Sequence, residues 1–137
     1  MDVPNEDPEI TEAEYDDTAP EEEVPVFRIK FQKNDLPFFR PKLNEREVFI
    51  VKKPGKIDIF VPDLKLANII AANLNEIKAK WKPGTWCTNP ELTAISVLGK
   101  TSRKKIVNNI IPIIEKIIRD FYGIEKITKD LHGDEKR

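Results

Sequence analysis

The distribution of charge along the chain limits the possible folds more than any other feature of the sequence. Residues 1–26 hold eleven Asp and Glu residues and no Lys or Arg, whereas the residues from Phe27 onward hold all 23 basic residues and 13 acidic ones. The acidic segment also contains four prolines and few large apolar side chains, so it cannot bury enough surface to offset the entropy that ordering would cost. We therefore expect a disordered acidic tail over residues 1–25, a single basic domain over residues 26–131 and a frayed C-terminus over residues 132–137.

The first part of the basic domain has the pattern of β-strands. Phe27, Ile29 and Phe31 alternate with polar residues, the period of two that gives a strand one apolar face. Two further stretches rich in Val, Ile and Phe, 47–52 and 57–61, are separated by a Pro-Gly pair, which indicates a hairpin. These patterns predict a small antiparallel sheet of about three strands.

Two helices are expected after the strands. Asp63 is a suitable N-cap for a helix whose apolar residues recur from Leu66 to Trp81 at spacings of three and four. A short second helix is expected from the Asn-Pro-Glu start at 89–91 to Leu98, because an amide N-cap, a proline and an acid are typical of a first turn.

A third helix is expected over about residues 103–122, capped by Thr101 or Ser102 and stopped by Gly123. Pro112 falls on its polar side, where the helix can bend over the core. The predicted fold class is therefore α+β, with a small antiparallel sheet of about three strands followed by three helices.

The apolar face of this last helix is wider than a single stripe, because it holds seven isoleucines between Ile106 and Ile118. Such a face is either deeply buried in the domain or shared with a partner. The sequence therefore leaves open an alternative function: a protein–protein interaction or assembly module, including a homo-oligomer formed through the last helix.

The composition excludes several classes of site. With one Cys and one His, the chain can form neither an internal disulfide nor a zinc site of four cysteines or of two cysteines and two histidines. We expect no metal and no cofactor. The acidic N-terminus is unlike a secretory or mitochondrial presequence, and no apolar stretch reaches the ~20 residues that cross a bilayer. The lone Cys87 suits a reducing compartment, so we expect a cytoplasmic protein that contacts no membrane.

One enzymatic hypothesis rests on Glu47, Asp58 and Asp63, together with Lys65. A metal-dependent nuclease needs carboxylates and usually a lysine near the ends of adjacent strands. However, Asp63 is expected to cap a helix, Asp58 suits a solvated strand position, and the lysine falls on the helix. Cys87 and His132 have no identifiable acid to orient them as a nucleophile and base. We therefore expect no enzymatic activity.

Basic residues gather at the start of the last helix, after a Gly99 turn that is similar to a helix-turn-helix. A cationic cluster there opposes the helix dipole, so a bound phosphate or the acidic tail would compensate it; the alternative is a solvated helix start. Basic residues also alternate with aromatic ones, as in single-strand binders, although packing in the core is the alternative for Phe27 and Trp81. The candidate nucleic-acid-binding residues are Lys100, Arg103, Lys104, Lys105, Lys52, Lys53, Lys56, Arg40, Phe39 and Trp86.

These observations predict a non-enzymatic, nucleic-acid-associated accessory protein. Its basic body would contact phosphates, and its acidic tail, tethered at a high effective concentration, would compete for the same surface. The alternatives for the tail are a solubilising segment or one that docks on a basic surface of another protein. The sequence does not distinguish DNA from RNA.

Overall fold

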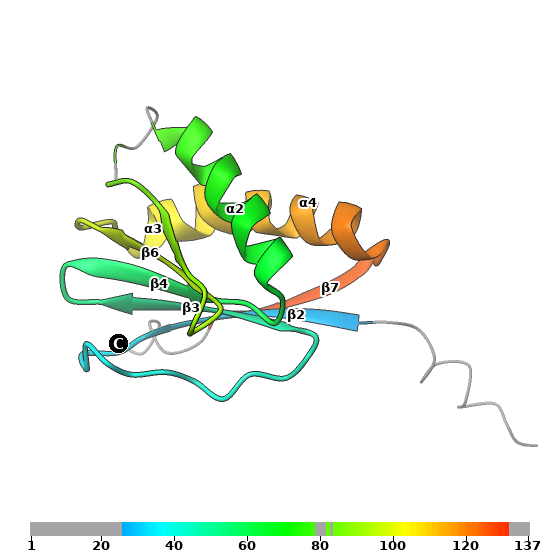
Figure 1. The fold of residues 1–137 in the computed structure, drawn as a ribbon, viewed down its shortest axis with the longest axis horizontal. Helices are drawn as coiled ribbons and strands as arrows, with labels where there is room; N and C mark the ends of the chain where they lie inside the picture. Colours follow the sequence, from blue (N-terminus) through cyan, green and yellow to red (C-terminus); the bar gives the residue numbers. More distant parts are fainter. Residues whose placement is uncertain (1–25, 79–81, 83, 132–137) are drawn as a thin grey trace, which may run out of the picture.

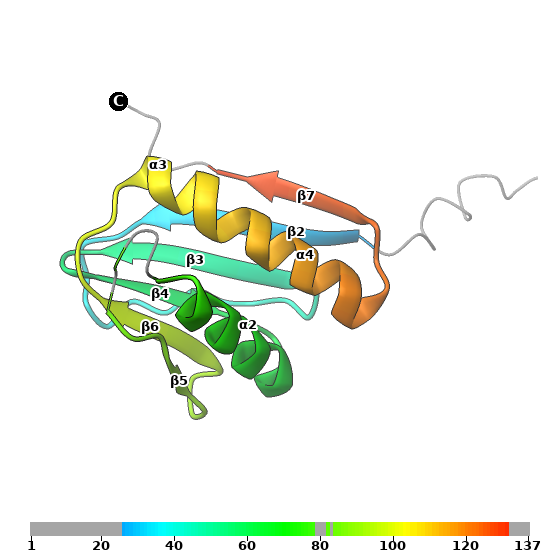
Figure 2. The same cartoon turned by 90° about the horizontal axis from the view of Figure 1, so that it is seen from above.

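A computed structural model describes residues 26–78, 82 and 84–131. Within them the chain forms one six-stranded mixed sheet in the order β5-β6-β4-β3-β2-β7. Two helices cover one face of this sheet, as Figures 1 and 2 show. The strands are β2 (Val26–Lys33), β3 (Glu47–Lys53), β4 (Lys56–Phe60), β5 (Cys87–Asn89), β6 (Ala94–Leu98) and β7 (Lys126–Asp130).

The predicted α+β class is correct, but the predicted arrangement of a three-stranded sheet and three helices is wrong. β2 pairs in parallel with both β3 and β7, whereas β3, β4, β6 and β5 form an antiparallel series. The stretch expected to be a second helix is instead a turn followed by β6. Residues near the end of the domain add β7 at the sheet edge.

The error over residues 89–98 has a local cause. The side chain of Asn89 accepts a hydrogen bond from the Glu91 N–H at 3.1 Å, the contact that the same residue would make as a helix N-cap. The chain then turns, because the Thr93 N–H donates to the carbonyl of Pro90. Ile95 and Val97 follow with the period of a strand and are buried.

The first helix, α2, spans Leu64–Glu76. As predicted, Asp63 is its N-cap, with Oδ1 accepting from the Lys65 N–H at 2.7 Å and from the Leu66 N–H at 3.4 Å. The helix ends earlier than predicted. The contribution expected of Trp81 lies outside the described residues, as do the acidic tail and the C-terminal residues 132–137.

The second helix is continuous from Arg103 to Tyr122 and is called the long helix below. It consists of α3 (Arg103–Lys105), a π-helical segment η2 (Ile106–Ile110) and α4 (Ile111–Tyr122). Pro112 lacks an N–H and its ring crowds the carbonyl four residues earlier. The wider π turn precedes it, with the Ile111 N–H donating to Ile106 O. Gly123 ends the helix at φ 66°, so the predicted bounds and stop are confirmed.

The main core lies between the sheet and the helices. Alternate residues of β2, β3, β4 and β6 point toward the helices and are almost completely buried, and Leu66, Ile70 and Leu74 of α2 pack against them. The loop of residues 34–46, which connects the parallel strands β2 and β3, crosses the opposite face of the sheet (Figure 1). There it covers a second, smaller cluster formed by Val51, Phe60 and Ala94.

Candidate functional site

The carboxyl ends of the parallel strands and the amino end of the long helix lie together along one edge of the sheet, the edge at which β2, β3 and β7 end. β2 ends at Lys33, β3 at Lys53 and β7 at Asp130. The guanidinium of Arg103, in the first turn of the helix, donates to the carbonyl of Leu131 just beyond β7 at 3.4 Å. In α/β structures ligands bind outside the carboxyl ends of parallel strands, and a helix amino end favours anions there.

A cleft of about 470 Å³ opens at this edge and is called the basic cleft below. Three segments form its walls: the end of β2, the β3–β4 turn, and residues 99–102 before the long helix. Two backbone hydrogen bonds join these walls, from the Gly99 N–H to Gly55 O at 2.8 Å and from the Asn34 N–H to Lys52 O at 2.9 Å. Backbone hydrogen bonds of the fold therefore hold the three walls of the cleft together.

The lining of the basic cleft is strongly positive. It contains Lys33, Lys52, Lys53, Lys56 and Lys100 and a single carboxylate, that of Asp35. Among the described residues no carboxylate lies within ion-pair distance of Lys33, Lys52 or Lys100. The described part of the chain carries 20 basic and 11 acidic residues, so the other charges of this part do not cancel the local excess, and a lining of this sign favours anions.

The start of the long helix adds polar groups to this positive lining. The Ser102 hydroxyl oxygen caps the helix by accepting from the Lys105 N–H at 3.2 Å. Thr101, which also lines the cleft, is only 6% exposed, and its Oγ1 has no hydrogen-bond partner in the described part of the chain. A buried hydroxyl without a partner is costly. The first helical turn holds Arg103, Lys104 and Lys105 and no acid, so nothing on the helix itself balances its positive end.

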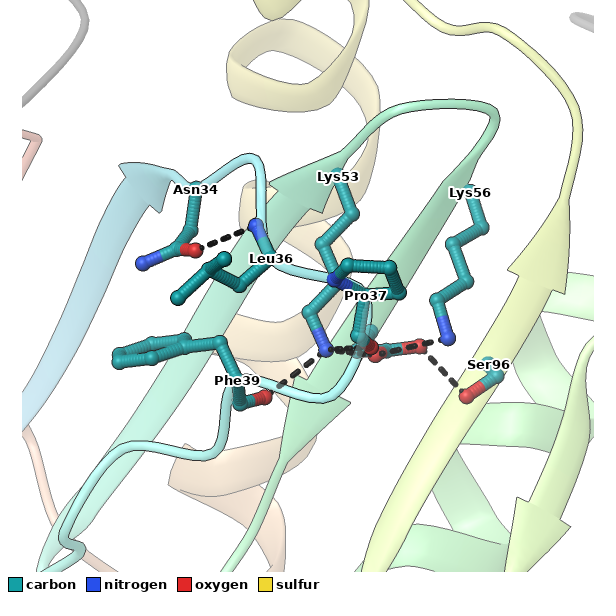
Figure 3. Close-up of polar contacts among 8 residues, drawn as sticks. Asn34, Leu36, Pro37, Phe39, Lys53, Lys56 and Ser96 are labelled. Carbon is teal, nitrogen blue, oxygen red and sulfur yellow. Dashed lines mark hydrogen bonds and ion pairs between the residues drawn. The ribbon is translucent and has the colours of Figure 1, made fainter.

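Lys53 takes a different role from the other lysines, as Figure 3 shows. Its ammonium donates to Asp58 Oδ2 at 2.6 Å and to the carbonyls of Pro37 and Phe39 at 2.9 and 2.8 Å. The other oxygen of Asp58 accepts from the Ser96 hydroxyl at 2.6 Å. This buried network ties the loop 34–46 to the sheet and holds the strands from which the β3–β4 turn projects.

The structure gathers some of the predicted nucleic-acid-binding residues and separates others. Lys52, Lys56 and Lys100 line the basic cleft, and Arg103, Lys104 and Lys105 follow in the first turn of the long helix. Arg40 and Phe39 belong to the loop 34–46 on the other face of the sheet.

Three of the sequence-based interpretations are wrong. Lys53 is 5% exposed, and its ammonium is engaged in the buried network. Trp86, named as a candidate binding residue, is only 2% exposed and lies in the main core, because Asn75 of α2 hydrogen-bonds its backbone N–H and carbonyl at 2.8 and 2.9 Å. The helix-turn-helix is absent, since the segment before Gly99 is strand β6.

Lys33 is a cleft residue that sequence reasoning missed as a binding group, and Thr101 was not included among the candidate binding residues. Lys33 reaches the cleft only because β2 and β3 are parallel and end at one edge, which no local pattern reveals. Thr101 was identifiable as a possible cap of the long helix. Ser102 takes that role, which leaves the Thr101 hydroxyl for other contacts.

The carboxylates considered for a nuclease have separate partners. Glu47 lies 3.2 Å from the Lys30 ammonium, Asp58 belongs to the buried network, and Asp63 caps α2. Burial raises the pKa of Glu47, but hydrogen bonds from Lys30 and from the Asn44 N–H outweigh it, and the pKa is lowered overall. Among the described residues no group of three or more His, Cys, Asp or Glu side chains is placed to hold a metal ion.

The isoleucines of the long helix face the sheet of their own domain. Six of the seven between residues 106 and 118 are buried in the main core; only Ile113 is partly exposed. A shallow groove of about 460 Å³ remains between α2 and α4, lined in part by Ile69, Ile113 and Phe121. Within the described residues, neither helix has the length and hydropathy needed to span a membrane.

Comparison with known proteins gives no match: no family model, no curated protein and no solved structure is significantly similar to this chain.

Proposed function

We propose that the protein is a non-enzymatic nucleic-acid-associated accessory protein that contacts the phosphate backbone through the basic cleft and the first turn of the long helix. The observation that carries this proposal is the convergence of Lys33, Lys52, Lys56 and Lys100 on one cleft at the positive end of a helix. Phosphate contacts supply most of the sequence-independent affinity of nucleic-acid-binding proteins. Lys104 and Lys105, both exposed beside the cleft, extend the positive surface that a bound DNA or RNA strand would follow.

The acidic tail is part of the same proposal. Its eleven carboxylates precede Val26, at the amino end of β2, while the basic cleft lies at the carboxyl end. An eight-residue strand spans about 25 Å, and a flexible chain of 25 residues has a root-mean-square end-to-end distance of about 28 Å. A tail that is flexible, as its composition predicts, can therefore reach the cleft and compete with a nucleic-acid strand.

The salt dependence of binding tests the proposal. Four phosphate contacts, shared between the basic cleft and the first turn of the long helix, give a slope of log K against log salt of about −3.6 for duplex DNA and about −2.8 for a single strand. Replacing Lys52 or Lys100 by glutamine should reduce the slope by about 1. Lys126→Gln is the matched control, because Lys126 is exposed at the amino end of β7, away from the cleft.

Binding is measured by fluorescence anisotropy with the full-length protein and with single- and double-stranded DNA and RNA. A second full-length variant, in which the tail Asp and Glu residues become Asn and Gln, should bind more tightly at low salt because the competitor has lost its charge. A slope shallower than −1, or one equally reduced by Lys126→Gln, contradicts binding through the cleft. Unchanged affinity after neutralisation of the tail contradicts competition.

The assembly module is the second candidate, and the groove between α2 and α4 is what favours it. Most of the apolar surface that suggested it is already used by the domain, since the isoleucines pack on their own sheet. An oligomeric mass that does not depend on nucleic acid, and that Ile113→Glu converts to a monomer, would favour this candidate over the first.

A further inference from the structure

The Thr101 hydroxyl has no role within the described part of the domain. Thr101 lines the basic cleft and is more than nine-tenths buried, yet its Oγ1 has no hydrogen-bond partner among the described residues. Because unpaired buried hydroxyls reduce stability, each one in a native structure requires an explanation. The oxygen itself is closed to solvent, so a ligand oxygen in the cleft that accepts its hydrogen bond, after the Thr101 side chain turns toward the cleft, provides one.

The surroundings of Thr101 specify the charge of such a ligand. Thr101 lies two residues before the long helix, whose first N–H groups have no acceptor within the helix. The first helical turn is entirely basic, so a bound anion would relieve both the repulsion among these side chains and the unbalanced helix dipole. An anion at this position would therefore be held by neutral donors as well as by lysines.

The balance of charge in the cleft favours a ligand with more than one negative charge. Lys53 is neutralised by Asp58, and Lys56 lies 3.6 Å from the same carboxylate. Lys33, Lys52 and Lys100 remain, opposed only by Asp35 among the lining residues. Asp58 balances only one of the two charges of Lys53 and Lys56, so an excess of three positive charges remains. An internal phosphodiester carries one negative charge, whereas a terminal phosphomonoester carries about two at neutral pH.

We propose that the basic cleft is a discrete site for one phosphoryl group, bound by the Thr101 hydroxyl and the surrounding lysines, and that it prefers a terminal phosphomonoester to an internal phosphodiester. This inference rests on the proposed nucleic-acid binding and deepens it: the group recognised is the phosphorylated end of a strand. Thr101 supplies a directional hydrogen bond, which a diffuse positive surface lacks.

The test compares two oligonucleotides of the same sequence, one with a 5′-phosphate and one with a 5′-hydroxyl, binding to the full-length protein. We expect the phosphorylated strand to bind with a Kd about tenfold lower at neutral pH. The preference should fall as the pH drops below about 6, where the monoester takes up its second proton. None of the residues that line the cleft is a histidine.

The Thr101→Val variant separates binding from folding. Valine keeps the shape of the side chain and removes only the hydroxyl, so the preference for the phosphorylated strand should fall to about twofold or less. The melting temperature without ligand should stay the same or rise, because an unpaired buried hydroxyl is lost. Thr101→Ser should retain most of the preference. Thr128→Val, at an exposed position of β7, should change neither property.

Each remaining outcome overturns a definite part of the reasoning. Equal, salt-dependent binding of both strands refutes the phosphomonoester site and leaves the nucleic-acid proposal in place. Binding of neither strand refutes the proposed function. In that case inorganic phosphate is titrated into the protein while the amide shifts of residues 99–104 are followed by NMR. This titration shows whether the cleft binds a phosphoryl group although the protein binds no nucleic acid. A Thr101→Val variant that melts at a lower temperature shows that the hydroxyl has a structural partner, which also refutes the site.

Discussion

Replacing Lys53 by methionine should destabilise the domain by about 3–5 kcal/mol, because it leaves the Asp58 carboxylate buried without its main counter-ion. The side chains of Lys53 and Asp58 are 2% and 6% exposed, with 2.6 Å between Nζ and Oδ2. The substitution also removes the donor from the carbonyls of Pro37 and Phe39. Lys56 stays 3.6 Å from the carboxylate and is only 29% exposed, so it offsets part of the loss and the expected cost lies near the lower value.

Urea denaturation followed by the fluorescence of the buried Trp86 measures this cost. Domains of this size unfold with a free energy of about 5–15 kcal/mol, so the variant should retain a measurable transition. The double variant Lys53→Met/Asp58→Leu should recover most of the loss, because an apolar pair carries no desolvation penalty. Lys56→Gln, which removes the weaker contact to the same carboxylate, should cost about 0–1 kcal/mol.

A loss below about 1 kcal/mol in Lys53→Met would refute the reasoning, because it would place the ion pair in the class of surface contacts. A double variant as unstable as the single one would refute it in another way. The cost would then come from the lost contacts to the loop 34–46 and not from the unpaired carboxylate.

Two further predictions concern single residues of the fold. The lowered pKa of Glu47 means that its ionised form stabilises the folded state at pH values above the ordinary glutamate pKa of about 4.5, and that this contribution is lost as the pH falls through the lowered folded-state pKa. Glu47→Gln should therefore reduce the unfolding free energy at pH 7 and flatten its decline in acid, measured by urea denaturation across that range; an unchanged acid decline would contradict the assignment. Gly123→Ala should cost about 1 kcal/mol, because φ is 66° while a Cβ would meet no atom within 4 Å; a thermal melt identical to the wild type would show that the helix end relaxes.

Local patterns predicted the features whose sequence signals are local. The alternation in β2, the Asp63 cap of α2 and the stop at Gly123 each depend on residues within a few positions of one another, and each is present. The turn at 89–93 shows the limit of this reasoning. An Asn side chain that accepts a hydrogen bond from the N–H two residues later can begin either a helix or a turn. Which of the two forms depends on what the following residues pack against.

The candidate site was predicted only in part for the same reason. The basic residues around residue 100 were visible in the sequence, and four of them lie in or beside the cleft. Lys53 and Trp86 were misjudged because burial depends on which loop or helix covers a position. For Lys53 that cover is the loop 34–46, and for Trp86 it is α2 with Asn75.

The sequence by itself determined where charge lies along the chain, where the first three strands run and where the long helix begins and ends, because those properties follow from side-chain chemistry and short-range hydrogen bonds. Only the tertiary structure decided that β2 pairs in parallel with β3 and β7, and hence that lysines from three distant segments meet at the start of the long helix. Strand pairing joins residues far apart in sequence through backbone groups that every residue carries. The partner of a strand is therefore selected by the packing of the whole domain and is not encoded in any one stretch.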